Sequence, residues 1–232
     1  MSSPLVESIR AAFLQCRDMD ASLNERLGAL AASVRVVSPA FADAVDRLVG
    51  RLQKANVGAG APDVGDLLPP FHLPDEDGRI VSLPSLLERG PVAVVLHRGH
   101  WCPYCRINTR ALAQAGPRIE AAGGQLVAIM PDRQPYASAI RVEAEADFPV
   151  LTDMDNGYAM SLNLVFWVGE EMQALMKMAA IDLLEYQGNE FWMVPVPATF
   201  VVARDGRIKA RFVDPDYRKR MTIENMLAAF GA

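Results

Sequence analysis

Trp101-Cys102-Pro103-Tyr104-Cys105 contains two of the three cysteines of the chain, separated by two residues. The apolar run Val92 to Leu96 precedes this stretch, and a helix-compatible segment over residues 106–115 follows it. We therefore expect the cysteine pair at a junction between a strand and a helix. The first turn of a helix leaves backbone N–H groups unpaired and carries partial positive charge, so it favours an anion.

A cysteine thiolate at such a junction is stabilised and becomes nucleophilic near neutral pH. Pro103 suits the first helical turn because it lacks the N–H that would be unpaired there. Packing alone gives no reason for a proline between two cysteines at this place. The pattern therefore predicts thiol redox chemistry at Cys102 and Cys105 rather than two inert core cysteines.

Length and composition are typical of a globular protein of one or two domains, with 232 residues, 51% apolar and 22% charged. The net charge of −5 does not favour binding to nucleic acid or to an anionic membrane. The dense basic cluster Arg218-Lys219-Arg220 lies beside Asp214 and Asp216, and we interpret it as a solvated face.

The N-terminal sequence and the apolar runs bear on the compartment. No apolar run approaches the ~18 residues that span a bilayer. Glu7 and Arg10 interrupt the apolar positions of the first residues, unlike the pattern of a signal peptide. We expect a cytoplasmic protein, and in that reducing compartment a C-x-x-C pair is more often catalytic or metal-binding than structural.

Residues 1–57 are expected to form an N-terminal helical region, because apolar residues recur there at helical spacing in three stripes. The stripes are Leu5, Ile9, Phe13 and Cys16; Leu23, Leu27, Leu30 and Val34; and Phe41, Val45, Leu48, Val49 and Leu52. Ser38-Pro39 is typical of a helix start, and residues 56–60 are typical of a stop. We interpret Cys16 as a small buried hydrophobe; the alternative is a resolving cysteine for the distant pair.

Residues 62–232 are expected to form a second unit, joined to the first by small residues at 58–62. The pattern predicts strands at 67–73, 80–83, 92–97, 125–130, 149–151, 199–203 and 207–213. It predicts helices at 106–122 with a break at Gly116-Pro117, at 136–146, 156–164 and 170–184, and from Thr222. Strands separated by helices indicate a mixed sheet covered on both faces. Core positions are expected for Trp167, Trp192, Met172, Met176 and Met178.

Several motifs within about residues 62–230 are similar to those of one known family. They are Val64-Gly65-Asp66, Phe71-His72-Leu73, the hairpin Asp75 to Leu83, His97 to Cys105, Pro197 to Val202 with Asp205-Gly206, and Asp214 to Tyr217 with Arg220. In these motifs the chain resembles the peroxiredoxin-like (alkyl hydroperoxide reductase/thiol-specific antioxidant) branch of the thioredoxin-fold superfamily. The resemblance implies an α/β, thioredoxin-like fold with a mixed central sheet flanked by helices, to which residues 1–57 add a helical extension.

The chain departs from the family pattern at two positions that bind peroxide. If Cys105 takes the peroxidatic place, Cys102 stands where the family has threonine or serine. Pro197 stands where an arginine is expected, although Arg98 or Arg106 could substitute. Leu96 likewise replaces the buried aspartate of thioredoxin. We therefore expect peroxide reactivity below that of a full peroxiredoxin.

The resemblance leaves two assignments for the cysteines. In thioredoxin-like chemistry Cys102 attacks and Cys105 resolves; in peroxiredoxin-like chemistry Cys105 attacks peroxide and Cys102 condenses with the sulfenic acid. The family resemblance favours Cys105 for peroxide. Either route ends in a Cys102–Cys105 disulfide that an external thiol reduces. The resemblance also implies a cis peptide bond before Pro197, next to the cysteines. For Trp101 two positions are open: it either shields the thiols or packs at the sheet edge.

A zinc site is the alternative from another class. His97, His100, Cys102 and Cys105 are ligands that zinc accepts, but four ligands within nine residues would need a cramped loop. We interpret the two histidines as residues that tune the thiolate pKa, and His72 as structural.

The sequence thus predicts a thiol-dependent oxidoreductase in which Cys102 and Cys105 cycle between dithiol and disulfide, supported by Arg98, Trp101, Pro103 and Pro197. Its substrate would be a hydroperoxide or a disulfide, and its reductant a thioredoxin-like protein or a small thiol. We expect no organic cofactor and no metal. The alternative is a redox-sensing or zinc-holding module without turnover. Because three apolar stripes exceed what the α/β unit needs, we also expect a homodimer.

Overall fold

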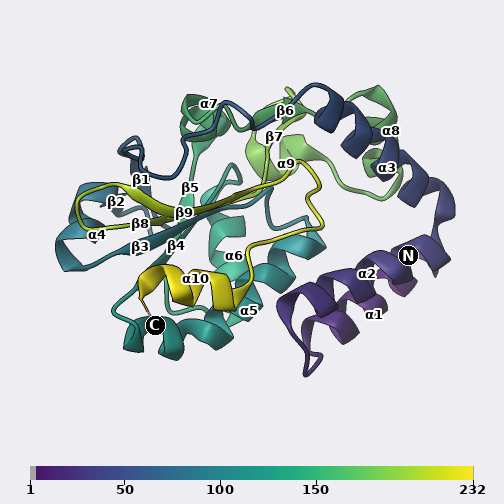
Figure 1. The fold of residues 1–232 in the computed structure, drawn as a ribbon. Helices are drawn as coiled ribbons and strands as arrows, with labels where there is room; N and C mark the ends of the chain where they lie inside the picture. The colour runs from purple at the N-terminus through teal and green to yellow at the C-terminus, as the bar shows by residue number, and fades with distance from the viewer. Residues whose placement is uncertain (1–3, 232) are drawn as a thin grey trace.

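A five-stranded mixed sheet in the order β5-β4-β3-β8-β9 forms the centre of the fold (Figure 1). The computed structural model describes residues 4–231. The central strand β3 (Val92–Leu96) is parallel to β4 (Gln125–Met130), which is parallel to β5 (Val150–Thr152). On its other side β3 pairs antiparallel with β8 (Ala198–Val202), which pairs with β9 (Ile208–Val213). The predicted mixed, thioredoxin-like sheet is confirmed.

Two short antiparallel pairs flank this sheet. They are β1 (His72–Pro74) with β2 (Ile80–Ser82), and β6 (Val165–Trp167) with β7 (Met193–Pro195). The helices that follow β2 along the chain are α4 (Leu83–Arg89), α5 (Pro103–Ala121), α6 (Gln134–Ala144), η1 (Met154–Asn156), α7 (Gly157–Ser161), α8 (Glu170–Met178), α9 (Leu183–Gln187) and α10 (Ile223–Phe230).

Strand β3 separates two apolar cores because its side chains alternate between the faces of the sheet. Ala93 and Val95 pack with residues of α5, α6 and α10. Val94 and Leu96 belong to the other core, which reaches the first turn of α5 and the N-terminal helices. All five residues of β3 are buried, so the sheet holds the start of α5 in place.

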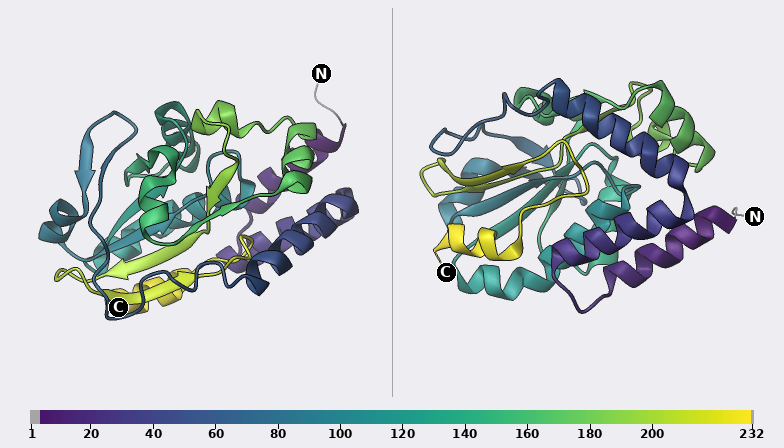
Figure 2. Two further views of the ribbon diagram at one scale, coloured as in Figure 1. Left: turned by 90° about the horizontal axis from the view of Figure 1, so that it is seen from above. Right: turned by 45° about the vertical axis from the view of Figure 1, so that its right-hand side comes forward.

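The N-terminal helices α1 (Pro4–Arg17), α2 (Leu23–Val37) and α3 (Pro39–Lys54) confirm the predicted helical region. Helices α1 and α2 pack on α5, and α3 packs on α8, as the two views in Figure 2 show. Most residues of their apolar stripes are buried within the same chain, with Leu30 0% exposed; Ile9 and Phe41 are half-buried, and the side chain of Leu5 lies outside the described residues. The physical reason for expecting a second chain is therefore removed, and the homodimer stays a prediction without that support.

Replacing Leu30 with alanine tests how far α2 contributes to stability. We expect the free energy of unfolding to fall by about 2–5 kcal/mol, because the substitution leaves a cavity in a buried site. Val36 on the same helix is 80% exposed, so Val36→Ala is the matched control and should change it by less than about 0.5 kcal/mol. Equal effects in chemical denaturation would show that α2 is not part of the folded core.

Four predictions about helices and core residues were wrong. Helix α5 continues through Pro117, because Ile119 beyond it is buried and packing holds the last turn. The segment 170–184 is two helices, and residues 156–164 form only the short α7. Trp192, Met172 and Met176 are buried as expected, but Trp167 is 46% and Met178 83% exposed.

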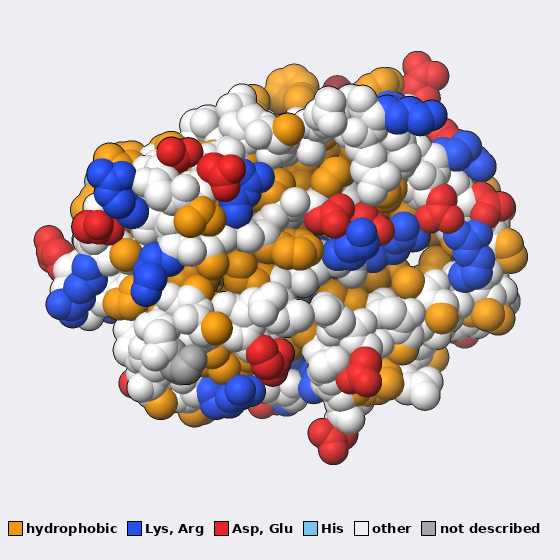
Figure 3. Space-filling view, viewed as in Figure 1, with side chains coloured by type: hydrophobic (Ala, Val, Ile, Leu, Met, Phe, Trp, Pro, Cys, Tyr) orange, Lys and Arg blue, Asp and Glu red, His pale blue; other side chains and the backbone are white. Residues whose placement is uncertain are grey.

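The surface shown in Figure 3 has acidic and basic side chains interspersed rather than one continuous basic field. Arg218, for example, forms ion pairs with Asp46 and Asp216. Within residues 4–231, none of the helices has the length and apolar character needed to cross a bilayer.

Candidate active site

The cysteine pair lies where the sequence predicted it, between the end of β3 and the start of α5. Cys102 is the N-cap residue of α5, and Pro103 occupies its first turn. Cys105 lies in that same turn, with its N–H bonded to the Cys102 carbonyl at 3.0 Å. Both thiols are free and buried, with Cys102 1% and Cys105 0% exposed. The junction therefore presents both sulfur atoms to the positive end of a helix.

Two arginines direct donors at the sulfur atoms. The Cys105 Sγ accepts hydrogen bonds from the backbone N–H of Arg98 at 3.3 Å and from Arg220 Nη2 at 3.4 Å. The Arg98 Nη1 lies 3.9 Å from the Cys102 Sγ. Hydrogen bonds to a charged acceptor are about twice as strong as neutral ones. The arrangement therefore stabilises a negative charge on the pair.

The pKa shifts of the two thiols favour Cys102 as the site of that charge, although two of the three donors are directed at Cys105. Burial opposes ionisation of this thiol, but the hydrogen bond from Cys105 and the charges of Arg98 and Arg220 lower the pKa of Cys102 to about 5. Burial, together with the hydrogen bond and the negative charge of Cys102, raises the pKa of Cys105 well above its ordinary value. These shifts favour a pair with one thiolate, Cys102, and one thiol, Cys105, near neutral pH.

Arg98 is held in place by two aromatic rings. Its guanidinium lies 4.7 Å from the ring centre of Trp101 and 3.8 Å from that of Tyr217. Tyr217 packs edge-on against Tyr104, the residue between Pro103 and Cys105, at 5.4 Å. Arg98 is 3% exposed. Trp101 thus covers the Arg98 guanidinium beside the thiols. The sequence alone had left open whether this tryptophan shields the thiols or packs at the sheet edge.

Arg220 was assigned to a solvated face, and that interpretation was wrong. Arg218 and Lys219 do form surface ion pairs, but Arg220 turns inward and is 4% exposed. Its Nη1 donates to the carbonyls of Tyr217 and Lys219, which leaves Nη2 directed at Cys105. The cation missing at Pro197 is therefore supplied from a different segment. The only indication in the sequence was the resemblance of the 214–220 tail.

Arg106, the other candidate substitute, does not reach the sulfur atoms. It forms an ion pair with Glu143 at 2.6 Å and stacks over Phe13 of α1 at 4.1 Å. Burial works against ionisation of Glu143, but hydrogen bonds from His100 and Arg106 lower its pKa to about 2. This cluster joins α1, α5 and α6 and is structural.

The two histidines of the proposed zinc set lie in different surroundings. The buried His97 has its Nε2 3.4 Å from Thr109 Oγ1, and burial and then the charge of Arg220 lower its pKa to about 3. The His100 Nε2 instead meets Glu143 at 3.3 Å. Across the described part of the chain, no group of three or more His, Cys, Asp or Glu residues could hold a metal ion. The structure therefore does not bring His97, His100 and the two cysteines together as one set of ligands.

Asp132, two residues after β4, is a buried acid that sequence reasoning missed. Its Oδ2 accepts the backbone N–H of His100 at 2.7 Å, and its Oδ1 has no hydrogen-bond partner. A Cβ at Gly99, where φ is 136°, would lie 2.5 Å from Asp132 Oδ1 and 2.5 Å from Trp101 Nε1. Burial and the nearby Cys102 charge raise the pKa of Asp132 to about 7. Glycine therefore lets this carboxyl approach the loop that leads to Cys102.

Residues 64–211 match the AhpC/TSA family. The chain belongs to this family. The match covers the thiol pair and the sheet as far as residue 211 in β9, whereas α1 to α3 and Arg220 lie outside it. AhpC/TSA relatives provide thiol-dependent peroxidase and thiol–disulfide chemistry, so the family agrees with the chemistry of the site.

Solved structures show the same fold. Peroxidoxin BcpB from Mycobacterium tuberculosis is 19% identical, with a TM-score of 0.56 over 72% of this chain and 96% of that one. Reduced Prx3 from Vibrio vulnificus is 14% identical, with a TM-score of 0.58 over 74% and 99%. A cysteine-to-serine mutant of Peroxiredoxin 6 of Arenicola marina is 13% identical, with a TM-score of 0.57 over 73% and 72%. No protein of curated function matches the chain in sequence.

Pro197 of this AhpC/TSA chain is trans, since residues 4–231 contain no cis peptide bond, and the expected cis bond was wrong. Val196 donates its N–H to the Leu164 carbonyl at 2.7 Å, and Ala198 pairs with Leu96 at the end of β3.

Cys16 is 3% exposed and packs in the core of the N-terminal helices. Burial raises the pKa of its thiol. Both observations confirm that Cys16 is a small buried hydrophobe, and it forms no disulfide.

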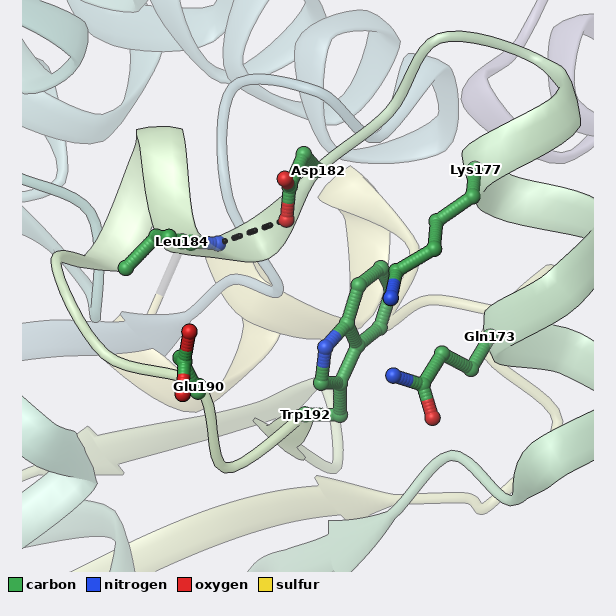
Figure 4. A pocket seen from close by; sticks show the side chains of 6 residues that line it. All are labelled: Gln173, Lys177, Asp182, Leu184, Glu190 and Trp192. Carbon is green, nitrogen blue, oxygen red and sulfur yellow. Dashed lines mark hydrogen bonds between the residues drawn. The ribbon is translucent and has the colours of Figure 1, made fainter.

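A pocket of about 270 Å³ lies between α8, α9 and the segment that leads to β7 (Figure 4). It is lined by Gln173, Lys177, Asp182, Leu184, Glu190 and Trp192. Lys177 lies over the Trp192 ring at 5.2 Å, and Asp182 accepts the N–H of Leu184 at 3.1 Å. None of these residues contacts the sulfur atoms, so the thiol pair remains the candidate active site.

Proposed function

We propose that this AhpC/TSA protein is a thiol-dependent oxidoreductase that reduces hydroperoxides or substrate disulfides through a Cys102/Cys105 cycle. The observation that carries this proposal is a buried thiol pair at a helix N-terminus with two arginines directed at its sulfur atoms. A thiolate held in this way is nucleophilic. Once it is oxidised to a sulfenic acid, the neighbouring thiol can condense with it to form the disulfide.

The cycle with a hydroperoxide has three steps. The Cys102 thiolate attacks the terminal oxygen, the O–O bond breaks, and the alkoxide leaves with a proton while Cys102 becomes a sulfenic acid. The Cys105 sulfur then attacks the Cys102 sulfur and expels water, which forms the disulfide. Two equivalents of an external thiol restore the dithiol and leave as a disulfide. With a disulfide substrate, a mixed disulfide at Cys102 takes the place of the sulfenic acid.

Cys102 is proposed as the attacking sulfur, in contrast to the Cys105 that the family resemblance implied for peroxide. The lowered pKa of Cys102 and the raised pKa of Cys105 support this order. A thioredoxin-like protein or a small thiol is proposed as the reductant, and a cytoplasmic location stays a prediction.

Stopped-flow oxidation of the reduced protein by hydrogen peroxide tests this function. Both thiols should be lost together, and the rate should rise with pH through about 5 and level off above it, because the reactive form is the Cys102 thiolate. Multiple turnovers with a thioredoxin-like reductant are expected. Oxidation without re-reduction would favour a redox sensor, and a rate that rises only above about pH 8, as for an ordinary thiol, would contradict the thiolate assignment.

The same experiment measures the strength of the peroxidase. We expect a second-order rate constant well below ~10⁷ M⁻¹s⁻¹, near the upper enzymatic range, because Gly99, three residues before the attacking Cys102, has no hydroxyl to donate to the peroxide. Arg98 and Arg220 supply the cations, so a measurable peroxide reaction remains.

A further inference from the structure

The charges around the thiol pair are unbalanced when the pair is oxidised. Arg98 and Arg220 are buried, and neither forms an ion pair with a carboxylate anywhere in residues 4–231. In the reduced protein the Cys102 thiolate supplies one negative charge beside them. In the disulfide neither sulfur is charged. Isolated buried charges are costly, so the oxidised form favours another anion nearby.

Asp132 is the buried acid placed to become that anion. It is 0% exposed, and only one of its carboxyl oxygens has a partner. The bonded N–H belongs to His100, two residues before Cys102, so the carboxyl is bonded to the short loop that leads to the thiol. An unpaired buried oxygen is unusual and suggests a group that exchanges a proton or accepts a donor during function.

The ionisable groups that act on Asp132 are few. Burial is the largest cause that raises its pKa; the His100 hydrogen bond lowers it, the Cys102 charge raises it further, and Arg133 lowers it. Tyr186 of α9 is also affected by the charge of Asp132. The imidazole of His97 is held neutral by burial and by Arg220, so it does not compete for the proton.

We propose that Asp132 is the internal proton donor of the redox cycle, protonated while Cys102 is a thiolate and ionised once the disulfide has formed. This inference rests on the proposed function. The single negative charge of this region thus moves from the Cys102 sulfur to the Asp132 carboxylate and back, instead of being lost in each cycle.

The atoms and charges balance in each direction. The Cys102 thiolate, the Cys105 thiol, the Asp132 carboxylic acid and hydrogen peroxide give a disulfide, the Asp132 carboxylate and two waters. With a low-molecular-weight disulfide as oxidant, the products are the protein disulfide, the carboxylate and two thiols. When two external thiols reduce the protein disulfide, Asp132 recovers its proton from Cys102. No proton is exchanged with solvent in either half of the cycle.

Counting protons during oxidation tests this proposal. Reduced protein in weak buffer with a pH indicator is converted to the disulfide by hydrogen peroxide or by oxidised glutathione. At about pH 6, between the pKa of Cys102 and that of Asp132, the wild-type protein should take up less than about half a proton per disulfide. At about pH 8, where Asp132 is already ionised, it should take up about one.

Asp132→Asn should take up about one proton per disulfide at both pH values, because it has no internal donor. Asp153→Asn is the matched control. Asp153 is also buried with a raised pKa, but its oxygens accept the N–H groups of Tyr158 and Ala159 and it is unaffected by Cys102. It should behave as wild type.

The outcomes separate this inference from the proposed function. A wild-type protein that takes up about one proton at both pH values overturns the role of Asp132 while leaving the dithiol cycle intact. This comparison uses only the unmodified protein, so it decides the matter even if Asp132→Asn does not fold. A protein that neither oxidant converts to the disulfide overturns both proposals.

Discussion

Cys102→Ser should abolish reaction with peroxide, whereas Cys105→Ser should react once and stop at a sulfenic acid on Cys102. The reason is that Cys102 is the thiolate and Cys105 the thiol that resolves it. A serine at 105 retains a hydroxyl that can donate to the Cys102 sulfur, so the first step should survive within about tenfold of the native rate. A sulfenic-acid probe and intact mass measurement distinguish the two variants.

Cys16→Ser is the control for this experiment, because Cys16 is buried among the N-terminal helices and should leave peroxide reactivity unchanged. The reverse pattern, with a sulfenic acid trapped on Cys105 in Cys102→Ser at the native rate, would restore the assignment that the family resemblance implied.

Arg220→Met should raise the pKa of the Cys102 thiol by ~1–3 units, because it removes one of two buried cations that favour the thiolate. Peroxide oxidation should slow by ~10²-fold, as when one oriented donor is lost from an active site. The thiolate titration is followed by ultraviolet absorbance and the rate by stopped flow. The disulfide should also become harder to reduce, because the reduced form loses its stabilisation.

Arg218→Met is the matched control, since Arg218 belongs to the same basic cluster but pairs with Asp46 and Asp216. Its thiolate pKa and oxidation rate should equal those of the wild type. If the two variants behave alike, the contact of Arg220 with Cys105 does not act on the thiol pair.

Features set by local sequence could be predicted. The run before the cysteines becomes the buried β3, and Pro103 begins α5, because both depend on residues only a few positions apart. The N-terminal stripes likewise predicted α1 to α3. A thiol pair at a strand–helix junction follows from these elements alone.

Features set by distant contacts could not be predicted. Arg220 meets Cys105 across 115 positions, and its neighbours in sequence are ordinary surface charges. Asp132 reaches His100 across 32 positions, after a strand that carries no other sign of function. Pro117 stays helical because Ile119 is buried, and residue preference alone cannot show that. The charged residues around the thiol pair, Arg220 and Asp132, could therefore be identified only from the three-dimensional structure.

The distance along the chain between Arg220 and the thiol pair has a consequence during protein synthesis. Arg220 is added 115 residues after Cys105, which takes ~6–23 seconds at ~5–20 residues per second. Until then a nascent chain lacks one of the two cations that lower the Cys102 pKa. Its thiols consequently remain closer to ordinary, slowly oxidised cysteines while the polypeptide is being made, and they become reactive only when the 214–220 segment folds against them.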